Sequence, residues 1–228
     1  MAELTATADA AVSNKARDRA RHQNLEHGNY PNYYFHRQQS VPDARLSLLP
    51  VDLFKQKRIL DLGCNAGKIT IETMTYLGAQ KATGVDIDQI LIDQARAQPD
   101  SDKVEWQCRD FTQPGAIARN EWDTILLLSV TKWLHLHAGD EGLRALFRTL
   151  FEALPSGGTL VVEPQERENY AKAARKNKNL RPVFQSIQMW PPFEDDLNAI
   201  GFELIETIPR EEGGFSRPLM LWRKPPAE

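Results

Sequence analysis

RILDLGCNAG, at residues 58–67, is the stretch that decides the fold of this chain. A short apolar run ends at Leu62, and glycines follow at positions 63 and 67, before residues 68–77, which have the pattern of a helix. Glycines at such a turn let a ligand approach the backbone closely, and the first turn of a helix offers unpaired N–H groups. The stretch therefore predicts a strand, a tight turn and the N-terminus of a helix.

A second strand, ending in acidic residues, is predicted by ATGVDID at residues 82–88. The carboxylate of Asp86 is placed there to accept both hydroxyl groups of a ribose. The glycine spacing differs from the dinucleotide fingerprint G-x-G-x-x-G, and the lysine pattern of a phosphate-binding P-loop does not occur in the sequence. Strand, glycine turn, helix, strand and acid together predict a nucleoside-binding βαβ unit.

The spacing of Asp61 and the two glycines resembles motif I of the class I S-adenosylmethionine methyltransferases. The resemblance implies that Asp61 lies near the methionine end of the cofactor and that Asp86 binds the ribose. Arg109-Asp110-Phe111, after a third predicted strand, resembles the turn that contacts adenine in that family. Glycine turns followed by an acid also occur in dehydrogenases and in loops that bind no ligand. The register of Asp86 with Asp110 favours S-adenosylmethionine.

The composition describes a soluble globular chain of 228 residues, of which 41% are hydrophobic and 26% charged. The sequence has no apolar run of the roughly 20 residues that a membrane span requires, and its beginning lacks the apolar core of a secretory signal. The two cysteines, Cys64 and Cys108, have neither a disulfide framework nor zinc-ligand spacing. We therefore expect an intracellular monomer without a metal or a membrane partner.

From residue 58 onward, predicted strands alternate with predicted helices. The strands are expected at 58–62, 82–86, 103–108, 122–129 and 158–163, and the helices at 68–77, 89–97, 113–120 and 139–154. Such alternation predicts a parallel sheet covered on both faces. A helix at 193–200 and strands at 202–208 and 218–223 follow, and the two strands predict an antiparallel hairpin. The expected fold is the α/β, Rossmann-like class I methyltransferase fold with a seven-stranded, mostly parallel sheet.

Two segments outside this core are rich in aromatic or basic residues. Residues 1–24 are expected to form a disordered or basic arm, and residues 25–228 a single methyltransferase domain. Within the domain, we expect an aromatic lid at 28–45, a helix at 46–54 interrupted at Pro50, and a basic insertion on the substrate side at 164–190. The net charge of −3 argues against indiscriminate nucleic-acid binding. The basic segments are either local RNA contacts or solvated surface.

Several further motifs make the resemblance more specific. They are GNYPNYY with Arg37 and Arg45, DLGCN, VDID, TKWLHL with GDEGL, EPQ with Tyr170 and Lys172, and GFSRP near the end. With these motifs, residues 28–224 resemble the bicoid-interacting-protein-type RNA methyltransferases, a family that includes methylphosphate capping enzymes of small nuclear RNA. Glu166-Arg167 stands where the family has Pro-Trp after EPQ, so the aromatic platform of the family is missing here.

The resemblance implies methylation of a terminal phosphate oxygen at an RNA 5′ end. The residues implied to meet the phosphates are Tyr33, Arg37, Tyr170 and Lys172. The implied cofactor residues are Tyr34, Arg45, Asp61, Gly63, Cys64, Asn65, Gly67, Asp86, Ile87, Asp110, Phe111 and Leu128. A phosphate oxygen is already anionic near neutral pH, because its second pKa is about 6. The reaction therefore needs placement by cations and hydroxyl groups rather than a general base.

The sequence leaves several functions open. TKWLHL and FSRP favour the 5′-γ-phosphate of a small non-coding RNA as acceptor, whereas HGNYP favours an RNA 5′-monophosphate. A ribonucleoprotein component with dispensable catalysis and a small-molecule methyltransferase are the other hypotheses. We expect S-adenosylmethionine, which yields S-adenosylhomocysteine, as cofactor. We also expect ribonucleoprotein partners and a location in the nucleus, with the cytoplasm as the alternative. His135 and His137 are expected as polar positions in a loop, with a substrate contact as the alternative.

Overall fold

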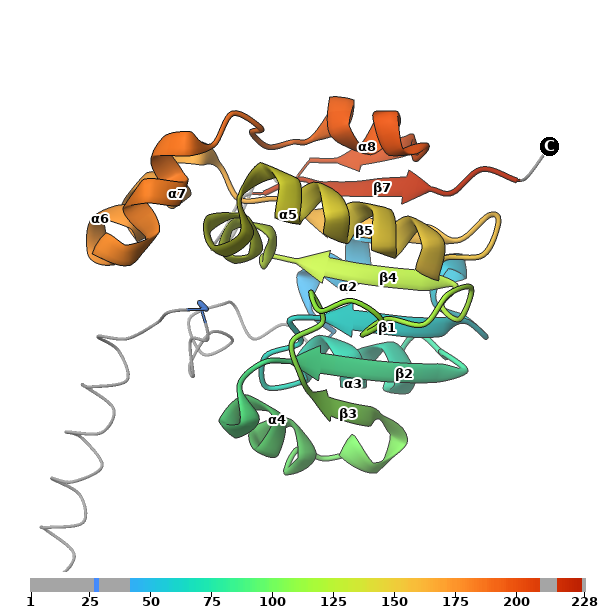
Figure 1. The fold of residues 1–228 in the computed structure, drawn as a ribbon. Coiled ribbons are helices and arrows are strands. Elements are labelled where there is room, and N and C mark those ends of the chain that lie inside the picture. Colours follow the sequence, from blue (N-terminus) through green and yellow to red (C-terminus); the bar gives the residue numbers. More distant parts are fainter. Residues whose placement is uncertain (1–26, 29–41, 210–216, 227–228) are drawn as a thin grey trace, which may run out of the picture.

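A seven-stranded sheet organises the computed structural model, which describes residues 27–28, 42–209 and 217–226 (Figure 1). Its strands are β1 (Arg58–Leu62), β2 (Lys81–Asp86), β3 (Glu105–Cys108), β4 (Thr124–Leu128), β5 (Thr159–Glu163), β6 (Glu203–Ile208) and β7 (Leu219–Arg223), in the order β3-β2-β1-β4-β5-β7-β6. β1 to β5 pair in parallel, and β7 pairs antiparallel with β5 and β6. This confirms the predicted mostly parallel sheet with an antiparallel hairpin.

Helices cover both faces of the sheet. They are α2 (Ala44–Leu48), α3 (Lys68–Thr75), α4 (Gln89–Arg96), α5 (Thr131–Ala153), α6 (Arg167–Lys176), α7 (Arg181–Ser186) and α8 (Glu194–Ile200), with 3₁₀ turns at Val51–Leu53, Ser101–Lys103 and Lys178–Leu180. α5 and α8 lie on one face, and α2 and α3 on the other (Figure 1). Pro50 separates α2 from the turn at Val51–Leu53, which confirms the predicted interruption, although α2 begins at Ala44 rather than at residue 46 and the part after Pro50 is a single 3₁₀ turn. None of the described helices is both long and apolar enough to cross a membrane.

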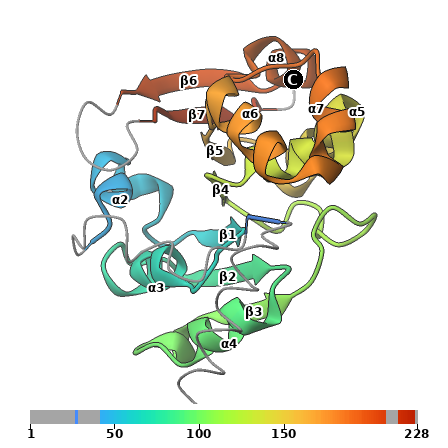
Figure 2. The ribbon, with the colours of Figure 1, turned by 90° about the vertical axis from the view of Figure 1, so that its left-hand side faces the viewer.

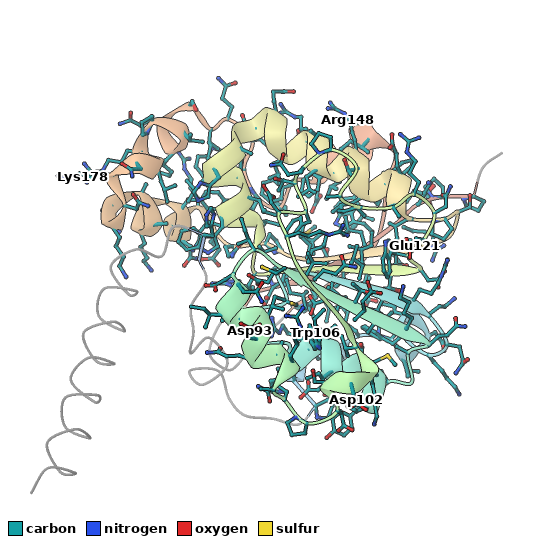
Figure 3. All side chains as sticks on the ribbon, turned by 60° about the horizontal axis from the view of Figure 1, so that its bottom comes forward. Asp93, Asp102, Trp106, Glu121, Arg148 and Lys178 are labelled. Carbon is teal, nitrogen blue, oxygen red and sulfur yellow. The ribbon has the colours of Figure 1, made fainter. Side chains whose placement is uncertain are left out.

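α6 and α7 lie beyond the carboxyl ends of β4 and β5, beside the first half of α5 (Figure 1, Figure 2). The side chain of Lys178 marks the outer end of this segment, whereas Arg148 lies far from it on the second half of α5 (Figure 3). Ligands of open α/β sheets bind at the carboxyl ends of the strands. The basic residues of α6 and the turn after it therefore lie at the edge where a substrate is expected.

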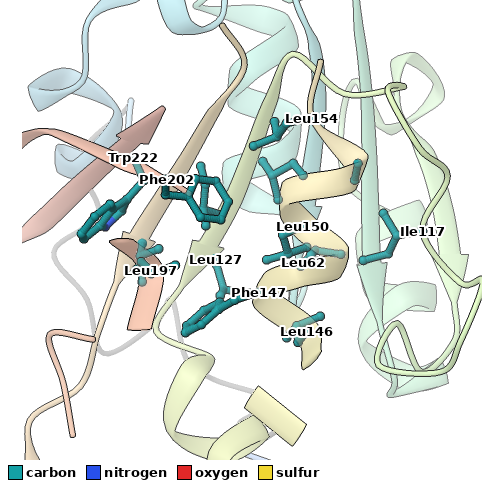
Figure 4. Close-up of a cluster of buried hydrophobic side chains, with 14 of the residues drawn as sticks. Leu62, Ile117, Leu127, Leu146, Phe147, Leu150, Leu154, Leu197, Phe202 and Trp222 are labelled. Atoms are coloured by element: carbon teal, nitrogen blue, oxygen red, sulfur yellow. The ribbon is translucent and has the colours of Figure 1, made fainter. Parts of the chain in front are cut away.

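The two faces of the sheet bury separate apolar clusters. β4 is buried along its whole length, and its neighbouring residues Leu126 and Leu127 belong to opposite clusters because successive side chains of a strand alternate between faces. Phe147 and Leu150 of α5 pack on the Leu127 face (Figure 4). Burial on both faces fixes β4 at the centre of the sheet, and with it the position of the residues that follow the strand.

Two helix predictions are wrong. Residues 113–120 form turns rather than a helix, because Pro114 and Gly115 interrupt the segment and Gly115 has a φ of 76°. The helix expected at 139–154 begins earlier, at Thr131, and has a non-helical backbone at Gly139, with φ 66° and ψ −174°. Trp133 and Leu136 are buried on one face of these added turns, and residues three apart share a face of a helix. The apolar contacts of this face explain the earlier start.

Candidate functional site

A cavity of about 200 Å³ opens at the carboxyl edge of the sheet, next to β1, β2 and β4. Its wall comes from the segments that follow the strands, from the first half of α5 and from residues 27–28. The lining residues are His27, Gly28, Gly63, Asn65, Asp86, Ile87, Asp110, Phe111, Thr112, Leu128, Ser129, Val130, Trp133, Leu134, His137 and Ala138. This is the edge at which open α/β sheets bind ligands, so the cavity is the candidate site.

Asp86 supplies a buried carboxylate to the cavity wall. It ends β2 and is 7% exposed. Its Oδ2 accepts the backbone N–H of Asn65 at 2.9 Å, and its Oδ1 accepts the N–H of Asp88 at 3.0 Å. Burial raises the pKa of Asp86, and these N–H donors act against the rise. Because a carboxylate offers about four acceptor positions, Asp86 keeps the capacity to accept hydroxyl groups from a ligand.

Gly63 and Gly67 both need the backbone freedom of glycine, but for different reasons. Their φ angles are 77° and 82°, a region that other residues rarely adopt. Gly63 lines the cavity, and a Cβ there would lie 2.8 Å from Cγ2 of Val130. A Cβ on Gly67 would lie 2.4 Å from the ring of Trp106. Gly67 does not line the cavity, so its contribution is to let the start of α3 pack against Trp106.

Three predicted cofactor residues lie behind the cavity wall: Asp61, Cys64 and Arg45, each at most 3% exposed. Thr70 Oγ1 donates a hydrogen bond to Asp61 Oδ2 at 2.6 Å, and burial raises the pKa of Asp61 to about 6. Arg45 Nε donates to Asp43 Oδ1 at 2.9 Å, and its Nη1 donates to Glu163 Oε2 at 3.3 Å. Arg45 thus forms a buried charged network with Asp43 and Glu163. Direct contact of Asp61, Cys64 and Arg45 with a cofactor stays a prediction.

The other wall of the cavity combines apolar side chains with a second carboxylate. Ile87, Phe111 and Leu128 line the cavity together with Asp110. Ile87 is 41% exposed, which leaves apolar surface open to a ligand. Asp110 accepts the N–H of Thr112 at 2.9 Å. Mostly apolar walls with a few placed polar groups are typical of small-molecule sites. Among the described residues, no three His, Cys, Asp or Glu side chains come together to hold a metal ion.

The part of the wall formed by the residues after β4 and by the first turns of α5 was not predicted from the sequence. The missed residues include Ser129, Val130, Trp133 and Leu134. Their position after the fourth strand indicated that the segment lies near the substrate. Which side chains face the cavity depends on the helical turns that begin at Thr131, and these turns were not predicted.

The beginning of the predicted lid lies against this part of the wall. A Cβ on Gly28 would lie 1.9 Å from Nε1 of Trp133, and Gly28 has a φ of 72°. The rings of His27 and His137 lie 4.8 Å apart. Position 28 therefore admits only glycine without a shift of the indole, and residues 27–28 close one side of the cavity.

The structure describes only some of the residues expected to contact the phosphates. Tyr33, Tyr34 and Arg37 lie outside the described residues. Lys172 is exposed on α6. Tyr170 is fully buried, and its ring packs against Trp190 with 5.5 Å between centroids. Burial raises the pKa of the Tyr170 hydroxyl far above its usual range. The contacts of these side chains with phosphate stay predictions.

The prediction that both histidines lie in a loop is wrong: His137 belongs to α5 and lines the cavity, and His135 is fully buried in the same helix. The Nε2 atom of His135 lies 2.7 Å from Asp140 Oδ1. Its Nδ1 lies 3.4 Å from the hydroxyl of Tyr170. Asp140 also accepts the N–H groups of Gln188 and Met189. His135 therefore links α5 to α6 and to the chain after α7.

Two family models match this chain. One, described as "Bicoid-interacting protein 3 (Bin3)", matches residues 122–224, and the other, described as "Methyltransferase domain", matches residues 59–158. The first includes β4, the start of α5 and the basic segment, and the second includes the glycine turn and Asp86. The two matches together contain most of the cavity wall.

Curated relatives match over most of the chain. The U6 snRNA methylphosphate capping enzyme Amus of Drosophila melanogaster is 31% identical over 88% of this chain and 75% of its own length. The Pre-miRNA 5′-monophosphate methyltransferase of Xenopus laevis is 31% identical over 68% of this chain and 72% of its own length. Both matched regions extend well beyond the glycine turn.

Solved structures share the fold. The N-methyltransferase NodS from Bradyrhizobium japonicum, in complex with S-adenosyl-L-homocysteine, superposes with a TM-score of 0.62. The superposition covers 90% of this chain and 98% of that structure at 16% identity. At this identity, the similarity shows the class I methyltransferase fold alone.

Proposed function

Because this chain belongs to the Bicoid-interacting protein 3 family of RNA methyltransferases, we propose that it methylates a 5′-terminal phosphate of RNA. The methyl donor is S-adenosylmethionine, and the acceptor is an oxygen of the γ-phosphate of a small non-coding RNA. The observation that carries the proposal is the cavity at the carboxyl edge, with Asp86 in its wall, in a chain that matches a methylphosphate capping enzyme over 88% of its length.

The cavity fits the cofactor by the chemistry of its walls. Asp86 has acceptor capacity for the two ribose hydroxyls. Ile87, Phe111 and Leu128 offer apolar surface for the adenine ring, and Asp110 offers an acceptor beside it. S-adenosylmethionine, when bound, supplies an electrophilic methyl group on a sulfonium. The task of the chain is to hold this group against the acceptor oxygen and to keep water away from it.

The acceptor needs little chemical activation. A terminal phosphate is already an anion near neutral pH, so the enzyme gains rate mainly by placement and charge balance. Exposed cations on α6, among them Lys172 and Lys176, lie at the edge where the acceptor enters. Tyr33 and Arg37, which the family motifs single out, complete the set that we assign to the phosphates.

A second candidate function is methylation of an RNA 5′-monophosphate. The Xenopus relative named for this activity is as identical as the Drosophila capping enzyme, but it matches 68% of the chain rather than 88%. The longer match favours the γ-phosphate. We further propose that the chain acts as a monomer in the nucleus with ribonucleoprotein partners. Light scattering of the purified protein tests the monomer, and a tagged chain in cells tests the location.

The decisive experiment measures transfer of labelled methyl from S-adenosylmethionine to one short RNA with three different 5′ ends. The ends are triphosphate, monophosphate and hydroxyl. We expect transfer to the triphosphate and none to the hydroxyl. Preference for the monophosphate would establish the second candidate. Binding of the cofactor without transfer to any end would contradict both and leave an RNA-binding role or a small-molecule substrate.

A further inference from the structure

Lys132 is a buried cation that the proposed mechanism has not used so far. It is the second residue of α5 and is 9% exposed. Its ammonium lies 4.3 Å from the centroid of the Trp133 ring, and Trp133 lines the cavity. Within the described ranges, no carboxylate or carbonyl oxygen accepts a hydrogen bond from Lys132 Nζ. Burial of an ammonium without an acceptor is costly, so a site of this kind suits an anionic ligand.

Arg217 is a second buried cation at the same wall. It is 7% exposed, and its Nη1 donates to Ser129 Oγ at 2.9 Å. Ser129 lines the cavity, and its hydroxyl also bonds to Glu163. Arg217 comes from the end of the chain, whereas Lys132 comes from the segment after β4. The fold therefore brings two cations that are distant in sequence to one side of the cavity.

The position of Lys132 is fixed by its backbone. Gln165 Oε1 accepts hydrogen bonds from Thr131 Oγ1 at 2.9 Å and from the N–H of Lys132 at 3.0 Å. The side-chain amide of Gln165 donates in turn to the carbonyl of Ser129. The residue after β5 thus holds the first turn of α5 in place. A preorganised cation loses little freedom when a ligand arrives.

The charges around Lys132 also favour a bound anion. Burial, followed by the positive charges of Arg217 and Lys176, lowers the pKa of Lys132 to about 8. Lys176 is exposed on α6, at the open side of this cluster. Cations gathered in this way repel one another, and a bound anion removes that repulsion.

We propose that Lys132 and Arg217 form the subsite that binds the acceptor phosphate beside the cofactor cavity, with Lys176 at its entrance. The inference rests on the proposed function and deepens it, because it names residues that the family motifs had not assigned to the phosphate. Lys132 neutralises the phosphate from the Trp133 side and Arg217 from the Ser129 side. The attacking oxygen is left facing the cavity.

The test compares Lys132→Met with the matched control Lys55→Met, which removes an exposed cation before β1, at the amino edge of the sheet. Methyl transfer to 5′-triphosphate RNA and the affinity for S-adenosylmethionine are measured for each. We expect Lys132→Met to lower kcat/KM for RNA at least about 10-fold, since hydrogen bonds to charged groups contribute strongly. The cofactor affinity should not change, and Lys132→Arg should recover part of the rate. An unchanged kcat/KM in a folded Lys132→Met would overturn the proposal.

A binding measurement separates this inference from the proposed function. The affinities for 5′-triphosphate RNA, for the same RNA with a 5′-hydroxyl and for inorganic triphosphate are compared in wild type and Lys132→Met. Suppose that the wild type transfers no methyl group but prefers the triphosphate end in binding, and that Lys132→Met loses this preference. The phosphate subsite then stands, and the proposed reaction is wrong. If the variant keeps the full preference, the subsite is wrong whatever the reaction. The subsite would also be overturned if inorganic triphosphate bound to the wild type while the RNA showed no preference for the triphosphate end over the hydroxyl end.

A third measurement needs no variant that removes the cation from the fold. Lysines of the wild-type protein are dimethylated with ¹³C, and the Lys132 resonance is assigned by its absence in Lys132→Arg. Inorganic triphosphate should shift this resonance and raise its pKa above the value of about 8 in the free protein. A resonance that stays in place while those of exposed lysines on α6 move would contradict a buried phosphate subsite.

Discussion

Single residues decide whether the cavity accepts a nucleoside, and Asp86 is the most telling of them. Its carboxylate is held by two N–H groups of the neighbouring turns and still faces the cavity. A neutral side chain of the same shape keeps one acceptor oxygen but loses the charge that strengthens a bond from a ribose hydroxyl. The contribution of such a bond is about 1.5–3 kcal/mol.

We expect Asp86→Asn to weaken binding of S-adenosylmethionine by about 10- to 100-fold, which corresponds to that loss. Titration calorimetry measures the affinity, and thermal unfolding checks that the fold survives. Asp93→Asn is the matched control, because Asp93 is an exposed carboxylate on the outer surface of α4 (Figure 3). Equal affinities of Asp86→Asn and wild type would remove Asp86 from the site.

Asp61 predicts a pH dependence of stability. Burial raises its folded-state pKa from 3.8 to about 6. Between these values, the folded protein binds more protons than the unfolded chain, so the contribution of Asp61 to stability falls as the pH rises from about 4 to 6. Because Asn does not titrate, Asp61→Asn does not lose stability in this way as the pH rises. We expect the unfolding free energy of the variant, relative to wild type without cofactor, to rise by about 2–3 kcal/mol between pH 4 and pH 7.

Urea unfolding at several pH values measures this difference. Comparison at each pH removes the titration of the other carboxylates, which both proteins share. Asp102→Asn, which changes an exposed carboxylate (Figure 3), serves as control and should show no such trend. A difference between Asp61→Asn and wild type that stays constant across the range would contradict the raised pKa.

At the scale of elements, the strands and the helices α3 and α4 could be predicted closely, whereas the first half of α5 could not. β1 has the predicted bounds, because a short apolar run between polar residues and glycine leaves little choice. The turns at 131–138 mix polar and apolar residues, and only their contacts with α6 and α7 reveal a buried face. Trp133 was therefore missed and His135 misjudged, whereas Gly63 and Asp86, which motif I and the acid after the second strand single out, both line the cavity.

The contact between residues 27–28 and α5 gives the prediction for this scale. Gly28→Ala adds a Cβ that would overlap the indole of Trp133, and the positive φ strains it further. We expect weaker cofactor binding, by about 10-fold or more, since strained backbone of this kind costs about 1–3 kcal/mol. Gly115→Ala is the matched control, because Gly115 has a φ of 76° with nothing within 4 Å of its Cβ position. Equal cofactor affinities of the two variants would show that residues 27–28 do not shape the cavity.

For the whole molecule, the distribution of charge matters more than its sum. The chain carries a net charge of −3, and exposed cations gather at the carboxyl edge on α6 and the turn after it: Lys172, Arg175, Lys176 and Lys178. Other exposed cations lie before β1, at the amino edge of the sheet, and on the second half of α5: Lys55, Lys57 and Arg148. Of these two groups, the first lies where an RNA 5′ end would approach the cavity.

This difference makes the salt dependence of RNA binding a test of the whole surface. Replacing Lys172, Arg175 and Lys178 by Gln should reduce the slope of log K against log salt by up to about 2, because each single-strand phosphate contact contributes about 0.7. The control replaces Lys55, Lys57 and Arg148 by Gln, which changes the net charge equally. It should keep the wild-type slope for a 5′-triphosphate RNA. Equal reductions in both variants would show that net charge, rather than a groove at the carboxyl edge, attracts the RNA.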